Sequence, residues 1–161
     1  IVWLRCESTG STAISVLGAI EIPVRAYSEY HHSLAMACLV DSCLFDDGWA
    51  TGNRGDWRSG AGHTATETVL WNTRGVETAL IRSFNYAQGY VIGTEDIGLY
   101  VETDTGLSTL HLGTAPVDYT EFVNGARYLR PQSLYESQRS RRLGLPEPVE
   151  GEPPSGELMV E

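Results

Sequence analysis

The residue types best suited to chemistry are two histidines, His32 and His63, which stand 31 positions apart at the start of two similar segments. The first segment runs from His32 to Ser42 and the second from His63 to Thr73. An imidazole titrates near neutral pH, so either ring could act as a general base. Histidines at equivalent places of a repeat could equally fill structural positions and hydrogen-bond to the backbone. Both interpretations are open at the level of the sequence.

Arginine and tyrosine side chains close to these histidines extend the candidate site. Arg54 and Arg58 lie between the two segments, and a guanidinium group binds a carboxylate through paired hydrogen bonds. Tyr30 directly precedes the His31-His32 pair and could protonate a leaving oxygen. We therefore predict that the catalytic residues are His32, His63, Tyr30 and Arg54, with Arg58 binding the substrate.

Aspartates and tryptophans in the same stretch suggest further roles. Asp46, Asp47 and Asp56 could divide into an acid and a base, or hold calcium, although Asp46 and Asp47 before a glycine also make an ordinary turn. Trp49 and Trp57 could stack on sugar rings or pack the loop against the rest of the chain. We predict Trp49, Trp57 and Asp56 as substrate-binding residues, and Asp46 and Asp47 as the candidates for a calcium site.

The composition limits the partners of the chain. Its 161 residues carry a formal net charge of −10, which argues against nucleic acids and anionic membranes. All 11 basic residues are arginines, so a lysine base or Schiff base is excluded within this chain. No apolar run approaches the about 20 residues that a membrane-spanning helix needs. Of the three cysteines, Cys38 and Cys43 lie in apolar surroundings and are predicted to be buried thiols, with a disulfide as the alternative in an exported protein.

Repeated short apolar runs must position these side chains. Strand-like segments separated by glycines and turn residues continue from Ile1 to Val101, and helical periodicity is missing before residue 129. Repetition at a constant interval is typical of stacked-repeat proteins. The repeat predicts Asp41 beside Asn72, and Ser42 beside Thr73, on neighbouring strands. We therefore predict an all-β fold, a right-handed parallel β-helix or solenoid, over residues 1–130.

The end of the chain differs in character. Ser133 and Glu136 form a capping box, and Gly144 is a natural helix stop, so Leu134–Leu143 is predicted to be a helix that covers the last strands or lies along them. Residues 131–144 are predicted to form this terminal capping unit. Residues 145–161 are rich in Pro, Glu and Gly and are predicted to be a disordered acidic tail or linker.

Several strings together resemble large bacterial parallel β-helix proteins of the pectate lyase-like superfamily. They are His31-His32, Trp49-Ala50-Thr51-Gly52, Gly60-Ala61-Gly62-His63, Val69-Leu70-Trp71-Asn72 and the closing Arg130–Gln138. In this sequence the Trp-Ala-Thr-Gly string follows in the next loop, whereas in the family it often follows the paired histidines directly. The resemblance implies an extracellular or cell-surface protein that acts on a polysaccharide, as a lyase or glycoside hydrolase on an acidic glycan. The alternatives are a non-catalytic glycan-binding or adhesin-type protein, and a structural fragment whose active site lies upstream.

Because Ile1 already starts a strand-like run, we expect this chain to be the C-terminal part of a longer protein, with N-terminal rungs missing from it.

Overall fold

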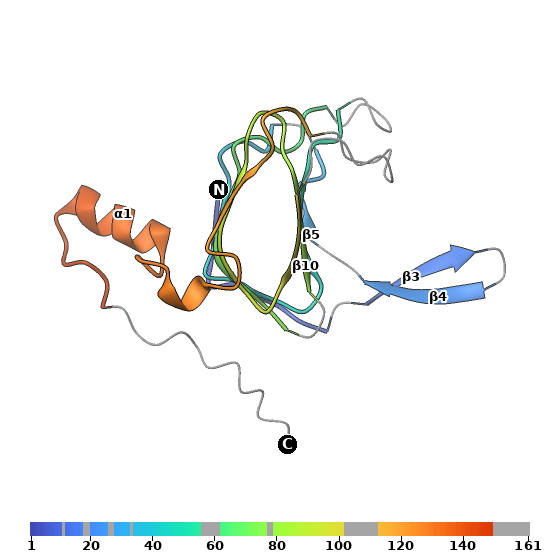
Figure 1. Ribbon diagram of the computed structural model, residues 1–161, viewed down its shortest axis with the longest axis horizontal. Helices are drawn as coiled ribbons and strands as arrows, with labels where there is room; N and C mark the ends of the chain where they lie inside the picture. The colour runs from blue at the N-terminus through green and yellow to red at the C-terminus, as the bar shows by residue number, and fades with distance from the viewer. Residues whose placement is uncertain are drawn as a thin grey trace, which may run out of the picture.

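The computed structural model describes residues 1–10, 12–17, 20–25, 28–32, 34–55, 62–76, 79–101 and 113–149. Two parallel β-sheets face each other, with a hydrophobic core between them (Figure 1). The strands of the first sheet are β1 (Val2–Leu4), β2 (Glu7–Ser8), β6 (Leu39–Asp41), β7 (Leu44–Phe45), β9 (Val69–Gly75), β11 (Tyr90–Glu95) and β13 (Tyr119–Glu121). The strands of the second sheet are β5 (Ser28–Glu29), β8 (Gly48–Gly52), β10 (Leu80–Phe84) and β12 (Gly98–Val101).

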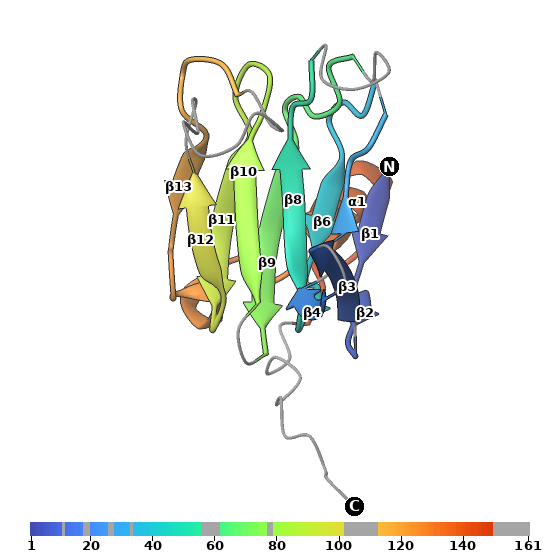
Figure 2. The same ribbon diagram turned by 90° about the vertical axis from the view of Figure 1, so that its right-hand side faces the viewer.

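The chain alternates between the two sheets from β8 onward. The first sheet has the order β1-β6-β9-β11-β13, and the second has the order β12-β10-β8-β5. The arrowheads of β8 and β10 point to the same end of the molecule, where the loops to the first sheet begin (Figure 2). Parallel strands need such crossovers, because a tight hairpin can join only antiparallel neighbours.

The predicted fold class, a right-handed parallel β-helix or solenoid, is wrong. The described strands form two separate parallel sheets and do not close into a barrel or solenoid. A third sheet is an antiparallel hairpin of β3 (Thr12–Leu17) and β4 (Ile20–Arg25), which projects away from the other two (Figure 1). Parallel sheets with one helix laid on them are compatible with an α/β fold. The prediction was wrong because it rested on a single repetition, that of the His32–Ser42 segment in His63–Thr73.

The register also differs from the prediction by one residue. Asp41 pairs with Trp71 and not with Asn72. Burial explains the difference, because the fully buried Val40, Leu70 and Val91 form one inward column across β6, β9 and β11. A shift of one residue would turn these side chains to the outer face of the sheet.

The outer face of the first sheet carries a column of left-handed residues. Ser42, Asn72 and Gly93 have φ values of 56°, 49° and 74° and lie side by side where β6, β9 and β11 bend. The positive φ of Gly93 favours glycine, and a Cβ atom there would lie 2.5 Å from the Leu129 side chain, which would have to shift.

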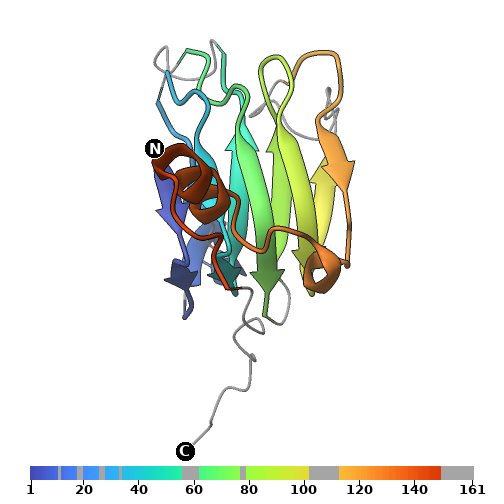
Figure 3. The ribbon, with the colours of Figure 1, turned by 90° about the vertical axis from the view of Figure 1, so that its left-hand side faces the viewer.

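The C-terminal segment runs along this column and ends in the predicted helix (Figure 3). It comprises the 3₁₀ turn η1 (Ala126–Tyr128) and α1 (Leu134–Leu143), whose bounds are those predicted. Ser133 caps α1 by accepting a hydrogen bond from the Glu136 N–H, and Gly144 ends it in a left-handed conformation. The helix lies along the outer face near β1, where Arg5 makes a paired hydrogen bond with Glu136.

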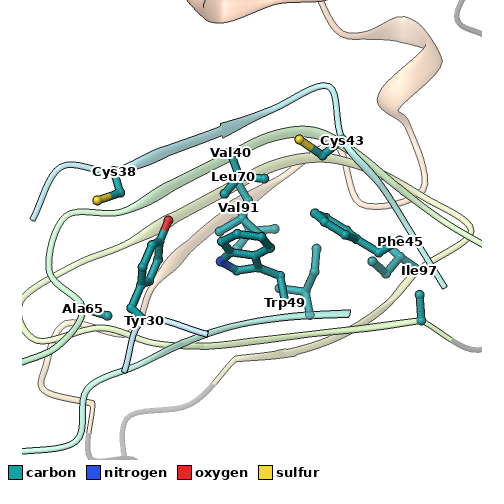
Figure 4. Close-up of a cluster of buried hydrophobic side chains, with 12 residues drawn as sticks. Tyr30, Cys38, Val40, Cys43, Phe45, Trp49, Ala65, Leu70, Val91 and Ile97 are labelled. Atoms are coloured by element: carbon teal, nitrogen blue, oxygen red, sulfur yellow. The ribbon is translucent and has the colours of Figure 1, made fainter. Parts of the chain in front are cut away.

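The hydrophobic core lies between the two sheets (Figure 4). Trp49 is its largest member and packs on Trp3, Tyr30 and Phe45 with ring centroids 5.3–5.8 Å apart. Cys38 and Cys43 are buried free thiols, as predicted. Within the described residues, no helix is long and apolar enough to cross a membrane.

Candidate functional site

Polar and aromatic side chains gather at the end of the molecule where β8 and β10 end. This is the upper end of the ribbon in Figure 2. We call this place the loop edge. Its residues are Glu29, His31, His32, Asn53, Arg54, His63 and Tyr86. They come from the end of β5 and the segment after it, from the two ends of the loop after β8, and from the turn after β10, so the second sheet and its turns position the cluster.

Arg54 forms one half of the loop edge. Its side chain is only 7% exposed, and its Nη1 donates to the Glu29 carboxylate at 3.1 Å. The Nδ1 atom of His31 lies 2.5 Å from the same carboxylate oxygen, and Arg54 also contacts the His31 ring. Arg54 is therefore held in an ion pair inside the protein, and its charge is already partly neutralised by Glu29.

His63 forms the other half. Its Nδ1 lies 3.2 Å from the Oδ1 of Asn53, a side chain that is only 2% exposed. The backbone N–H of Thr64 donates to the same oxygen at 3.3 Å, which supports the assignment of that atom as the amide oxygen. Because an amide oxygen only accepts hydrogen bonds, Nδ1 carries a proton, and in the neutral ring Nε2 is the nitrogen with the free lone pair.

An aromatic platform accompanies His63. Its ring stacks on Tyr86 with centroids 4.0 Å apart, and Tyr86 is 41% exposed. The backbone of His63 accepts a hydrogen bond from Leu34 N–H at 3.1 Å, and Thr66 bridges to Tyr86. The platform is thus fixed on both sides by backbone pairing.

The predicted histidine pair does not stack across neighbouring strands. His32 is exposed and packs edge-to-face on His31, with ring centroids 5.1 Å apart. His63 packs on Tyr86 instead. His32, His63 and Arg54 nevertheless belong to the same end of the molecule, joined through His31 and through Asn53 and Thr64.

Two predicted site residues lie in the core and not at the loop edge. Tyr30 is 6% exposed and Trp49 is 7% exposed, and their rings contact each other. Burial raises the pKa of the Tyr30 hydroxyl, so this group holds its proton more firmly than a free tyrosine. Trp49 has the packing role that the sequence offered as the alternative to sugar stacking.

Asp46 and Asp47 serve the turn between β7 and β8. Asp46 accepts a hydrogen bond from the Gly10 N–H, and the buried Asp47 accepts one from the Gly48 N–H at 2.8 Å. These bonds give both carboxylates structural partners. In the described part of the chain, no group of three His, Cys, Asp or Glu residues is placed to hold a metal ion. Asp56, Trp57 and Arg58 lie outside the described residues.

Four residues of the loop edge were not predicted as site residues, namely Glu29, His31, Asn53 and Tyr86. Tyr86 lies two residues after the end of β10, and an aromatic residue in the turn that follows an alternating strand is a signal that could have been noticed. Glu29 and Asn53 carry no comparable signal, because their partners are distant in sequence or depend on the path of the loop.

Comparison with known proteins adds no relative. No protein-family model matches the chain, and neither a curated protein nor a solved structure matches it. The function is therefore argued from the loop edge itself.

Proposed function

We propose that the loop edge binds an acidic glycan, as part of an exported carbohydrate-active protein. The observation that carries this proposal is the exposed stack of His63 on Tyr86. Rigid aromatic rings offer an apolar face to a sugar ring and polar atoms at their rim, which suits a ligand that is apolar on one face and hydroxylated at its edges.

The local charge supports an anionic ligand. The chain as a whole carries −10, yet the loop edge combines one arginine and three histidines with a single glutamate. The Glu29 carboxylate is already bonded to Arg54 and His31, so it presents little free negative charge to a ligand.

A titration of the protein with an oligogalacturonate, followed by isothermal titration calorimetry, tests this proposal. Tyr86→Ala should weaken binding about tenfold, since loss of one stacking face costs roughly 1.4 kcal/mol. Tyr128→Ala is the matched control, because Tyr128 is 70% exposed but lies in η1 on the outer face of the first sheet. A neutral oligosaccharide of equal length should bind more weakly. Equal affinities for wild type and Tyr86→Ala would contradict the assignment.

Catalysis as a polysaccharide lyase is the second candidate, favoured by the orientation of His63. An imidazole whose Nδ1–H is held by Asn53 presents Nε2 as a base, which could remove the ring proton next to a uronate carboxyl group. A lyase product carries a double bond, so ultraviolet absorbance of the same mixtures would detect it. His63→Ala should then lower turnover by roughly 100-fold, the scale for loss of a general base. Binding without new absorbance leaves glycan binding as the function.

A further inference from the structure

Cys6 and Cys43 occupy matching positions on neighbouring strands. Leu4 pairs with Asp41 in β1–β6, and Glu7 pairs with Leu44 in β2–β7, so Cys6 and Cys43 fall opposite each other between these pairs. The Leu44 N–H donates to the Cys6 carbonyl oxygen at 3.0 Å, which continues the parallel pairing across this position.

The two residues are also in direct contact. The Cys6 N–H donates to the Cys43 Sγ at 3.4 Å. Neighbouring strands lie about 4.8 Å apart, and disulfide-bonded cysteines have Cα atoms roughly 4.4–6.8 Å apart. The backbone separation therefore already suits a cross-link. Among the described strands β1 pairs only with β6, so the segment that follows β1 can adjust to the remaining geometry.

Their surroundings differ in a way that suits stepwise oxidation. Cys6 is exposed, so an external oxidant can reach it, whereas Cys43 is buried with 1% of its surface exposed. Burial raises the pKa of the Cys43 thiol to about 11, which makes Cys6 the first thiol to react.

We propose that Cys6 and Cys43 form a disulfide when the protein meets a small-molecule disulfide oxidant. The Cys6 thiolate attacks one sulfur of the oxidant, and the other sulfur leaves as a thiolate. The Cys43 thiolate then attacks the Cys6 sulfur of this mixed disulfide and expels the second thiolate. The two cysteines lose two protons and two electrons, and the oxidant is reduced to two thiols.

The cross-link would tie the N-terminal edge of the first sheet to the neighbouring segment between β6 and β7. Arg5, next to Cys6 in the segment between β1 and β2, forms the ion pair with Glu136, so the same segment also holds α1. Oxidation would therefore strengthen the edge of the sheet and the attachment of the helix together. A disulfide stabilises mainly by restricting the unfolded chain.

Incubation with oxidised glutathione at mildly alkaline pH tests the proposal. Peptide mapping under non-reducing conditions should find Cys6 linked to Cys43, with an intact mass lower by two hydrogen atoms. The Tm should rise on the order of 5–10 °C and return after reduction.

Three variants make the test specific. Cys38→Ala, which replaces the other buried thiol, should retain the cross-link, and Cys6→Ser and Cys43→Ser should each abolish it. If Cys43→Ser fails to fold, Cys6→Ser at the exposed position still provides the negative control. Oxidation that stops at a glutathione adduct on Cys6, or that links Cys38 or two chains, would overturn the proposal.

Discussion

The buried amide of Asn53 gives the His63 imidazole one orientation and one tautomer. The default tautomer of a free histidine carries its proton on Nε2, so the bond to Asn53 should be visible as a reversal of that preference. Nitrogen-detected NMR of the imidazole ring should show a protonated Nδ1 in the wild-type protein.

Replacement of Asn53 tests this orientation directly. Asn53→Ala removes the acceptor, and we expect the Nε2–H tautomer to become the major form. Asn53→Asp keeps an acceptor in the same place and should keep Nδ1 protonated. If Nδ1 of His63 stays protonated in Asn53→Ala, another group sets the tautomer. This measurement needs no ligand, so it stands apart from the glycan proposal.

Residue identity predicted part of the loop edge but not its contacts. His32, His63 and Arg54 were recognised because histidine and arginine carry chemistry in any context. The ion pair of Arg54 could not be predicted, because its partner Glu29 lies in a strand 25 residues away in the chain. Tyr30 and Trp49 were misplaced for the opposite reason, since large aromatic rings serve equally well in a core and on a surface.

At the scale of elements, the docking of α1 depends on polar contacts. The buried side chains of the helix are Ser137 and Ser140, so apolar burial contributes little. Ser133 instead joins helix and sheet, because its hydroxyl accepts from the Glu136 N–H and donates to the Asp41 carboxylate at 2.9 Å. Tyr135 N–H donates to the same carboxylate oxygen at 2.7 Å.

Ser133→Ala should therefore destabilise the protein by about 2 kcal/mol, from the lost cap together with the lost bond to a buried carboxylate. Urea unfolding would measure the change. Ser140→Ala replaces another buried serine of the same helix away from the cap, and we expect it to change the unfolding free energy by less than about 0.5 kcal/mol. Similar losses in the two variants would argue against the special position of Ser133.

The helix could be predicted because its sequence signals are local. The pairing of the strands could not be predicted, because it depends on distant residues. The capping box and Gly144 lie within or beside the helix itself. The register of β6 on β9 depends on which side chains reach the core, a property of the whole sheet. The antiparallel pairing of β3 with β4 was likewise not predicted from the sequence.

At the scale of the whole molecule, the two sheets are joined by buried polar residues as well as by the apolar core. Asp118 is 6% exposed and accepts hydrogen bonds from the Ser83 hydroxyl and from the Asn85 and Gly89 N–H groups. This network was not predicted from the sequence, because its members lie far apart in the chain and are individually ordinary. The intervals between paired strands also vary, as Leu80 pairs with Gly48 and with Gly98, so a constant repeat could not describe the fold.

The buried Asp41 links the stability of the whole molecule to pH. Burial raises the pKa of its carboxyl group, against the opposing hydrogen bonds from Tyr135, Ser42 and Ser133. Between the ordinary carboxyl pKa of about 3.9 and the raised folded value, the folded state binds more protons than the unfolded state. The contribution of Asp41 to stability is therefore present at low pH and is lost as the pH rises through the folded pKa.

Asp41→Asn should remove this dependence while it keeps the contacts. Its amide oxygen can accept from Ser133 and Tyr135, and its NH₂ can donate to the Ser42 hydroxyl, which then donates to the Gln132 carbonyl oxygen already within 3.0 Å. At neutral pH the variant should be at least as stable as the wild type, because no charge is buried. Urea unfolding at a series of pH values should show that the unfolding free energy of the wild type increases relative to that of the variant as the pH falls through the raised pKa. A wild type that loses stability relative to the variant on acidification would mean that the hydrogen bonds outweigh burial and that the carboxylate is the favoured folded form.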